Sequence, residues 1–370
     1  MKERIVVAMS GGVDSSVAAC LLKEQGLEVI GMTMCFNLPD ATGKKPTCCG
    51  FQGIEDARRV CHKLGIKHYV VNMQKDLEKY VIKDFVYEYL RGRTPNPCVR
   101  CNQYLKFGIL LKKAFSLDAK FLATGHYARI EKPPGHQVTR SPVYLLKKGK
   151  DRLKDQSYFL YRLNQKQLKQ ILFPLGDYRK SQVRNLARKF NLAVADKLGS
   201  QEICFLPDAD YRGFLIRRLS QINKTQIVAD IKPGLIVDKE GNILGKHKGI
   251  AFYTIGQREG LGIAKGYPLY ITKIDAENNL IIVGRREEAL KKEFLVKEPH
   301  FILKPLKKKV AMKVRIRYNH KEAQAEIIPF EDKIKVKFKK PQFAIAPGQS
   351  AVFYNKDIVL GGGIIDKVLA

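Results

Sequence analysis

Ser10–Ser16, with the sequence SGGVDSS, is the stretch that decides the fold. It follows the apolar, β-branched run Ile5–Met9, which predicts a buried strand, and it leads into Ser16–Leu22, which is apolar at helical spacing. The sequence therefore predicts a strand, a tight turn and a helix N-terminus. Gly11 and Gly12 let backbone amides approach an anion, and the helix dipole favours negative charge there. We expect this turn to hold phosphate.

The loop differs from two common nucleotide motifs, because no Lys follows its glycines and the pattern is not G-x-G-x-x-G. It resembles instead the pyrophosphate loop of the ATP pyrophosphatase (PP-loop) superfamily, whose members cleave ATP between the α- and β-phosphates. This resemblance implies that ATP binds with Mg²⁺. The alternative is an ordinary turn that contains Ser and Gly without binding phosphate.

The chain has 370 residues, which is enough for two or three domains with cores of their own. It contains no run of 18 uncharged apolar residues, so we expect no membrane span. The first predicted strand begins after four residues, which leaves no room for a signal or transit peptide. These features predict a cytoplasmic protein with no membrane partner.

The chain carries 67 Lys and Arg against 36 Asp and Glu, a formal net charge of +31 that is spread along its whole length. Such an excess favours a polyanionic partner, most simply nucleic acid. An organism whose proteins are all rich in Lys would give the same balance. The eight Cys residues, without a secretory signal, favour thiol chemistry or metal binding over structural disulfides.

Residues 1 to about 125 alternate between strands and helices. The predicted strands are 5–9, 29–34, 67–71 and 121–124, and the predicted helices between them are 16–22, 54–64, 77–90 and 104–115. Alternation of this kind predicts an α/β fold with a doubly wound parallel sheet. Ligands of such sheets bind beyond the carboxyl ends of the strands, where Ser10, Met34 and Gly125 all lie.

The later part of the chain changes pattern twice. A surface excursion is predicted over 131–150, and residues 155 to about 220 are predicted to be helical. Alternating segments after Gly234 predict a small β-rich module, and strands at hairpin spacing over 310–364 predict an antiparallel barrel. We therefore predict domains at 1–215 (the phosphate-loop domain with a helical extension), 216–290 (β-rich) and 291–370 (β-barrel).

Three cysteines are distinguished by their context. Cys98 and Cys101 lie in PNPCVRCN (95–102), where two prolines predict an extended loop that leads into a helix. Cys101 would then lie near a helix N-terminus beside Arg100, which should lower its pKa. Cys204 lies in GSQEICF (199–205), a loop between two predicted helices of the kind that can open and close over a site.

The motifs SGGVDSS, PNPCVRCN, TGHYA, KDQSYFL, SQEICF and YTIGQREGLG, in this order, resemble those of the tRNA-specific 2-thiouridylase (MnmA) family over essentially the whole chain. The resemblance implies a PP-loop domain, a small central domain and a C-terminal β-barrel. It implies an enzyme that places sulfur on C2 of the wobble uridine (U34) of tRNA. The implied partners are tRNA and a sulfur donor, either a cysteine desulfurase or a sulfur-relay protein.

The resemblance also implies the roles of two cysteines. The C2 oxygen of uracil is a poor leaving group, and adenylation by ATP would make it a better one. By the family pattern, Cys204 carries a persulfide and Cys101 acts as the second thiol, which leaves a Cys101–Cys204 disulfide to be reduced. Two ordinary buried thiols are the alternative.

Cys98 departs from the family pattern, because well-studied members carry Asp at this position. Cys98, Cys101 and Cys204 together offer three thiolates, enough to hold a [4Fe–4S] cluster, so the same thiolation through a cluster is a rival mechanism. A zinc site and simple sequence drift also remain open. The roles of the adjacent Cys48 and Cys49 are open too. The remaining cysteines are predicted to be core residues: Cys20, Cys35 and Cys61.

Binding residues follow from the resemblance, position by position. ATP is expected to contact Ala8, Met9, Ser10, Gly11, Gly12, Val13, Asp14 and Ser15, with the adenine near Met34 and Gly125. The target base is expected to face Asn96, Pro97 and Cys98. The expected tRNA contacts are His126, Lys154, Asp155, Gln156, Arg317, Tyr318 and Gln349. His126 could instead be a packing histidine, and Arg317 could lie on a solvated outer face of a strand.

Two further functions are kept beside this one. A small-molecule PP-loop enzyme of the amidotransferase type would need an ammonia source, and no glutaminase segment is visible. A basic RNA-binding protein with an inactive nucleotide site would not need the intact SGGVDSS sequence.

Overall fold

The computed structural model describes residues 2–36, 51–133, 143–197, 203–206, 210–222 and 231–369. The chain forms two compact units. Unit 1 comprises residues 1–81, 98–209 and 357–360, and unit 2 comprises residues 82–97, 210–356 and 361–370. Segment 82–97 thus belongs with the C-terminal half of the chain, which the sequence did not predict. The predicted three-part division at 215 and 290 stays a prediction.

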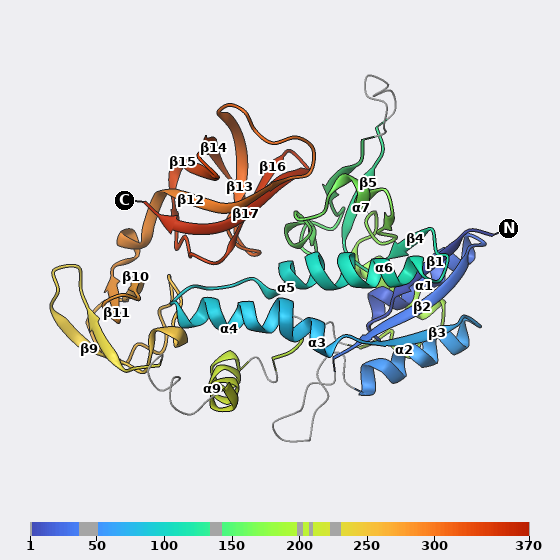
Figure 1. Cartoon of the computed structure of the whole chain (residues 1–370), viewed down its shortest axis with the longest axis horizontal. Coiled ribbons are helices and arrows are strands. Elements are labelled where there is room, and N and C mark those ends of the chain that lie inside the picture. Colours follow the sequence, from blue (N-terminus) through green and yellow to red (C-terminus); the bar gives the residue numbers. More distant parts are fainter. Residues whose placement is uncertain are drawn as a thin grey trace. The chain divides into compact units, whose positions relative to one another are not determined.

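Unit 1 is built on a parallel sheet of five strands in the order β3-β2-β1-β4-β7. The strands are β1 (Arg4–Ala8), β2 (Glu28–Cys35), β3 (His68–Asn72), β4 (Phe121–Ala123) and β7 (Ile171–Leu172). Every neighbouring pair is parallel, and Figure 1 shows β1, β2 and β3 running side by side. The predicted α/β class and its parallel sheet are confirmed.

Helices cover both faces of this sheet. The helices α1 (Val13–Glu24), α2 (Phe51–Lys63) and α8 (Lys180–Lys189) share one apolar core with Ile5 and Val7 of β1. The helix α6 (Leu111–Phe115) packs on β4. It continues a helix that starts with α5 (Pro97–Arg100) and runs through η2 (Cys101–Leu110), which is π-helical. A second short π-helix, η1 (Glu78–Ile82), follows α3 (Gln74–Leu77).

The prediction that residues 155–220 are helical throughout is wrong. The segment instead contains η3 (Ser157–Phe159), α7 (Gln165–Leu168), the strand β7, α8 and α9 (Tyr211–Ile222). β7 pairs with β4 through Leu122 and Ile171, because Ile171 can bury its side chain only by extending the sheet. The predicted surface excursion over 131–150 begins where β5 (Ala128–Glu131) ends, and it includes β6 (Leu145–Lys148), which pairs antiparallel with β5.

Unit 2 begins with the helix α4 (Lys83–Leu90), whose Tyr89 ring stacks on Tyr211 of α9 at 4.9 Å between centroids. Its smaller sheet has the order β10-β11-β8-β9. These strands are β8 (Gly234–Val237), β9 (Ile243–His247), β10 (Tyr270–Asp275) and β11 (Leu280–Gly284). β8 pairs with β9, and β10 pairs with β11, both antiparallel, in the region where a β-rich module was predicted. The short helices η5 (Ile250–Phe252) and η6 (Arg286–Ala289) complete this part.

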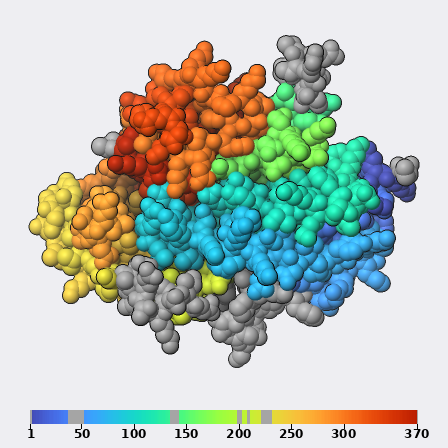
Figure 2. Space-filling model, in the orientation of Figure 1, coloured from blue at the N-terminus to red at the C-terminus, as the bar shows by residue number. Residues whose placement is uncertain are grey.

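The rest of unit 2 is a closed antiparallel barrel, as predicted. Its described strands are β12 (Leu290–Phe301), β13 (Val310–Arg315), β14 (Ala323–Phe330), β15 (Lys333–Phe343), β16 (Ser350–Asn355) and β17 (Ile358–Val368). Closure depends on β12, which pairs with both β15 and β17 and was not predicted. Phe294, Phe338 and Phe353 fill the interior, and Figure 2 shows the barrel strands, orange to red, as one packed mass.

None of the helices in the described ranges combines the length and the apolar character needed to cross a bilayer.

Candidate active site

The phosphate loop is the turn between β1 and α1. Gly11 has a φ of +69°, and a Cβ there would collide with the carbonyl oxygen of Gly53 in α2, so only glycine fits. Gly12 is the N-cap of α1 and supplies no side-chain acceptor for the first backbone amides of this helix. Free amides at a helix N-terminus form a binding site for an anion. The local geometry therefore agrees with the expected phosphate cradle.

The serine hydroxyls of the loop hold its shape. Ser15 Oγ donates to the Gly12 carbonyl oxygen at 3.2 Å and accepts from the Ser10 backbone N–H at 3.2 Å. Ser16 Oγ donates to the same carbonyl oxygen at 2.9 Å. Ser15 and Ser16 are both buried, so these bonds fix the backbone of the loop and occupy the Ser10 amide.

The expected ATP contacts gather at one edge of the sheet. Segment 8–15 follows β1, and Met34 lies near the carboxyl end of the neighbouring strand β2. Gly125 follows β4 on the other side of β1, and a Cβ there would lie 2.8 Å from the Asp14 carbonyl carbon and the Ser15 nitrogen. The fold brings these positions together, and their role as ATP contacts stays a prediction.

The Asp14 carboxylate has two partners that sequence reasoning missed. Lys180 Nζ lies 2.6 and 2.7 Å from its two oxygens, and the Tyr127 hydroxyl donates to Oδ1 at 2.7 Å. Burial, and then the charge of Asp14, raises the pKa of Tyr127 well above its usual range, which keeps the phenol protonated as a donor. Tyr127 lies inside the quoted TGHYA motif. Lys180 lies in no motif, and only the packing of α8 on α1 reveals it.

A second lysine borders the loop. Lys197 Nζ donates to the Gly11 carbonyl oxygen at 3.2 Å and to the Asp56 carboxylate at 2.7 Å. Asp56 is buried and also accepts from Gln52 at 2.9 Å. Two cations therefore lie beside a loop that has no lysine of its own, and each is paired with a carboxylate.

Cys98, Cys101 and Cys204 lie near enough to influence one another's ionisation. Burial raises the pKa of Cys98 to about 11, and the neighbouring Cys204 thiol contributes to the rise. Burial raises the pKa of Cys101 to about 12, opposed by the Lys106 ammonium group. All three are free thiols. The structure thus brings together the three cysteines that the sequence singled out.

The prediction of a lowered pKa at Cys101 is wrong. The helix begins at Pro97 and runs without a break from α5 into η2, so Cys101 lies inside it and not at its N-terminus. The thiol therefore gains little from the helix dipole, and desolvation dominates. Of the predicted core cysteines, Cys20, Cys35 and Cys61 are buried, as expected. Cys48 and Cys49 lie outside the described residues.

An iron–sulfur cluster or zinc ion would need a set of thiolates arranged as ligands. Within the described ranges, no group of three or more His, Cys, Asp or Glu side chains is arranged to hold a metal ion. The thiols of Cys98, Cys101 and Cys204 likewise do not form such a group. In this arrangement they do not fit a cluster, and no chemical step is derived through one.

The division of the chain into two units falls inside the expected target-base segment. Asn96 and Pro97 belong to unit 2, and Cys98 belongs to unit 1. Pro97 is buried at the first position of α5, whereas Asn96 and Cys98 are half-buried.

The expected tRNA contacts differ in exposure. Lys154 is exposed, but Asp155 is 2% exposed and accepts from the Gly149 N–H at 3.0 Å. His126 is buried between the rings of Phe107 and Phe173 and contacts the Thr124 hydroxyl at 2.6 Å. Burial lowers the pKa of His126 well below its usual range, which makes it a neutral packing residue in this structure.

The remaining expected tRNA contacts have protein partners. Gln156 Oε1 accepts from the Tyr127 N–H at 3.0 Å. In unit 2, Arg317 donates to the Phe343 carbonyl oxygen at 3.0 Å, and Gln349 donates to the Thr94 carbonyl oxygen at 3.1 Å. Tyr318 lies under the Arg315 guanidinium at 5.5 Å. Their tRNA roles stay predictions.

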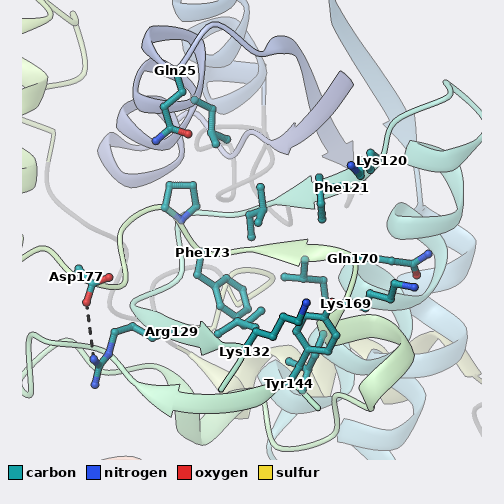
Figure 3. A pocket seen from close by; sticks show the side chains of 16 residues that line it. Gln25, Lys120, Phe121, Arg129, Lys132, Tyr144, Lys169, Gln170, Phe173 and Asp177 are labelled. Atoms are coloured by element: carbon teal, nitrogen blue, oxygen red, sulfur yellow. Dashed lines mark ion pairs between the residues drawn. The ribbon is translucent and has the colours of Figure 1, made fainter. Parts of the chain in front are cut away.

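A groove of about 600 Å³ in unit 1 contains none of the predicted site residues. Leu22 and Gln25, at the C-terminal end of α1, line it, whereas the phosphate loop lies at the other end of this helix. Its floor is apolar, including Phe121 and Phe173, and cationic side chains edge it (Figure 3). The candidate chemistry therefore depends on the loop and the cysteines, not on this groove.

Comparisons with known proteins agree with this arrangement. Models of three families match in turn: the tRNA methyl transferase HUP domain over residues 3–208, the tRNA methyl transferase PRC-barrel domain over 225–285, and the aminomethyltransferase β-barrel domain over 291–365. The tRNA-specific 2-thiouridylase MnmA 1 of Caldanaerobacter subterraneus is 52% identical, and the alignment covers 99% of both chains.

Two further relatives carry the same name. The tRNA-specific 2-thiouridylase MnmA of Halothermothrix orenii is 50% identical over 99% of both chains. That of Clostridium acetobutylicum is 48% identical over 99% of this chain and all of its own. Identity at this level over the full length shows the family. This chain belongs to the tRNA-specific 2-thiouridylase (MnmA) family.

Proposed function

We propose that this protein is a tRNA-uridine 2-sulfurtransferase, which uses ATP to replace the C2 oxygen of the wobble uridine (U34) of tRNA by sulfur. The observation that carries the proposal is the combination, in one compact unit, of an uncapped phosphate loop and three neighbouring thiols. Membership of the 2-thiouridylase family over the full length supports it.

The first step is adenylation. The uracil C2 oxygen attacks the α-phosphorus of ATP, the bond to the β-phosphate breaks, and pyrophosphate leaves. Amides at the start of α1 bind the phosphates, and Lys180 and Lys197 add positive charge beside the loop. Mg²⁺ bound with ATP would supply positive charge that neutralises the leaving pyrophosphate. The adenine lies near Met34 and Gly125.

The second step is sulfur transfer. The terminal sulfur of a Cys204 persulfide attacks C2, and AMP leaves. The Cys101 thiolate then attacks Sγ of Cys204, the sulfur–sulfur bond breaks, and the electron pair stays on the sulfur bound to C2. The resulting Cys101–Cys204 disulfide needs a two-electron reductant, and a cysteine desulfurase or sulfur-relay protein restores the persulfide. ATP, tRNA and reductant are together available in the cytoplasm, where we place the enzyme.

Other reactions receive less support. The family description of residues 3–208 refers to methyl transfer, but methyl transfer needs neither two thiols nor cleavage of ATP at the α-phosphate. An enzyme of the small-molecule amidotransferase type would leave the +31 charge and the cysteines without a purpose. Thiolation through a [4Fe–4S] cluster would require the three thiols to rearrange into a ligand set.

The experiment that tests the proposal combines the protein, ATP, unmodified tRNA and a persulfide donor. Pyrophosphate should appear only when tRNA is present, and labelled sulfur should enter the tRNA at U34. Affinity for tRNA should fall steeply with salt, because each neutralised phosphate releases counterions. Pyrophosphate release without tRNA, or AMP formation on a small-molecule acceptor, would contradict the assignment.

A further inference from the structure

The turn formed by residues 149–156 has an exposed tip and a fixed base. Arg152, Leu153 and Lys154 are exposed, and Leu153 is 89% exposed. Asp151 Oδ1 accepts from the backbone amides of Leu153 and Lys154 at 3.1 and 3.3 Å. These bonds hold two cations and one apolar side chain at an ordered tip, which suits contact with a polyanion that carries flat bases.

The base of this turn is bonded to two residues of the fold. Asp151 Oδ2 accepts from the backbone N–H of Lys180 at 2.9 Å. Gln156 makes two bonds to Tyr127: its backbone N–H donates to the Tyr127 carbonyl oxygen at 2.9 Å, and its Oε1 accepts from the Tyr127 N–H at 3.0 Å. A displacement of the turn therefore acts directly on Lys180 and Tyr127.

Lys180 and Tyr127 are also the two residues that hold Asp14 in the phosphate loop. The Lys180 ammonium group bonds both carboxylate oxygens, and the Tyr127 hydroxyl bonds one of them. Their side chains thus face the loop while their backbones hold the turn. Two separate connections, Asp151–Lys180–Asp14 and Gln156–Tyr127–Asp14, end on the same carboxylate. Neither connection has a role in the reaction as described.

We propose that Lys180 and Tyr127 are positioning residues that couple tRNA contact at the 149–156 turn to the geometry of the phosphate loop. The proposal rests on the ATP and tRNA binding of the proposed function. With tRNA on the tip, the turn holds Lys180 and Tyr127 in the arrangement that favours bound ATP. Because coupling between two sites is reciprocal, ATP must then tighten tRNA binding by the same factor. ATP therefore binds more tightly when the RNA is present.

The test measures that factor. The dissociation constant of tRNA is determined with and without a saturating ATP analogue whose α–β bridging oxygen is replaced by methylene, which cannot be cleaved. The reverse titration is made with tRNA present and absent. We expect the two factors to agree, at a value between about 5 and 150 for the unaltered protein. Lys180→Met and Asp151→Ala should each reduce the factor, because each breaks the Asp151–Lys180–Asp14 connection, and Lys180→Met combined with Tyr127→Phe should bring it to near 1.

Matched controls separate coupling from loss of charge or fold. Lys169→Met and Asp177→Ala remove one exposed charge each in unit 1 and should keep the full factor. In a double-mutant cycle, Asp151→Ala should add little to Lys180→Met. Lys180→Arg should restore part of the factor, because it keeps the positive charge at Asp14. If Lys180→Met lowers the melting temperature greatly, the coupling factor is measured in Tyr127→Phe, which removes only one hydroxyl.

Each outcome is decisive. A folded Lys180→Met or Tyr127→Phe protein with the full coupling factor overturns the inference. An unaltered protein that thiolates tRNA but has a factor of 1 overturns it as well and leaves the proposed function intact. An unaltered protein that neither binds nor thiolates tRNA overturns the proposed function itself.

Discussion

The phosphate loop Ser10–Ser16 and the cysteine segment Pro97–Leu110 both contain the start of a helix, yet they differ in what the helix start offers. In the loop, the N-cap residue leaves the first amides of α1 free, and glycine holds the turn open. In the cysteine segment, Pro97 occupies the first position, and the thiol of Cys101 lies one turn inside, 8% exposed. The loop therefore offers backbone amides in an arrangement that suits an anion, whereas the Cys101 thiol is buried and its pKa is raised.

The two proposed steps, adenylation and sulfur transfer, therefore start from different states of the protein. On the proposed function, phosphate binding uses amides and lysines that already lie at the loop. Thiol chemistry requires deprotonation, and burial opposes it by raising the pKa of Cys101 to about 12. Substrate binding must therefore change the surroundings of the cysteines before sulfur moves.

The largest expected effect separates sulfur transfer from adenylation. Cys101→Ser and Cys204→Ser should each abolish sulfur transfer but leave tRNA-dependent pyrophosphate release, because the hydroxyl cannot carry or displace sulfur. The measurement compares labelled sulfur in tRNA with released pyrophosphate. Cys20→Ser, at a buried thiol away from the site, is the control and should keep both activities in protein that folds. Loss of pyrophosphate release in the Cys101 variant would mean that the thiols also serve adenylation.

The next effect tests whether the Cys101 thiol is protonated at neutral pH in the folded protein. At pH 8 a thiol of pKa about 12 is ionised about a thousandfold less than an ordinary cysteine of pKa ~8.5, so Cys101 should be alkylated slower by that factor. Its rate should rise about tenfold per pH unit through pH 10, whereas that of a model peptide levels off above about pH 9. Mass spectrometry of iodoacetamide-treated protein measures the rate. Alkylation of Cys101 at the peptide's rate would remove the contrast.

The same pKa shift carries a stability consequence of definite sign. In the unfolded chain Cys101 ionises near its ordinary pKa, whereas in the folded protein it keeps its proton to about pH 12. Above about pH 9 the unfolded state therefore binds fewer protons, and the free energy of unfolding falls as pH rises. Urea denaturation at pH 8 and pH 10 should show this loss, and it should be smaller in Cys101→Ser.

A somewhat smaller effect is expected at the phosphate loop. Asp14→Ala should lower the rate of tRNA-dependent pyrophosphate release by about 100- to 1000-fold, because it removes the group that fixes the charged side of the loop. Binding of tRNA without nucleotide should stay near that of the unaltered protein. Glu24→Ala, at the exposed C-terminal end of the same helix, is the matched control. A normal adenylation rate in Asp14→Ala would refute the assignment of the loop.

The smallest effect decides the role of Cys98. Under persulfide chemistry Cys98 carries no sulfur, so Cys98→Asp should change the thiolation rate by less than about tenfold, or ~1.4 kcal/mol. Aerobically purified protein should work with a persulfide donor. Turnover that appears only after iron–sulfur reconstitution, with broad visible absorption, would replace the persulfide mechanism by the cluster mechanism.

Local pattern was sufficient for parts of this molecule and not for others. The run Ile5–Met9 and the glycines after it predicted both a strand and a ligand site, because periodicity and turn chemistry are local properties. The strand β7 has two residues, too few for a pattern, and it exists only because β4 offers an open edge. β12 closes the barrel with the charged sequence LKKEFLVKEPHF, whose alternation is broken.

The candidate site divides in the same way. The loop and the three cysteines were found because their residue types are unusual in sequence. Lys180 was missed because a lysine at the start of a helix has no distinguishing neighbours, and its importance comes from the packing of α8 on α1. The shift in the pKa of Cys101 was predicted in the wrong direction. That direction depends on where the helix begins, which is the least certain feature of a sequence prediction.

Gly125 shapes this site because it has no Cβ atom. The space that a methyl group would take at position 125 is already filled by the backbone of Asp14 and Ser15. The end of β4 can therefore approach the first turn of α1 this closely only because residue 125 has no Cβ. Gly125→Ala would act as a wedge, and it would displace the phosphate loop and the Asp14 carboxylate as one body. Gly125 has no functional group of its own, and we expect even the methyl side chain of alanine to change the geometry of the whole nucleotide site.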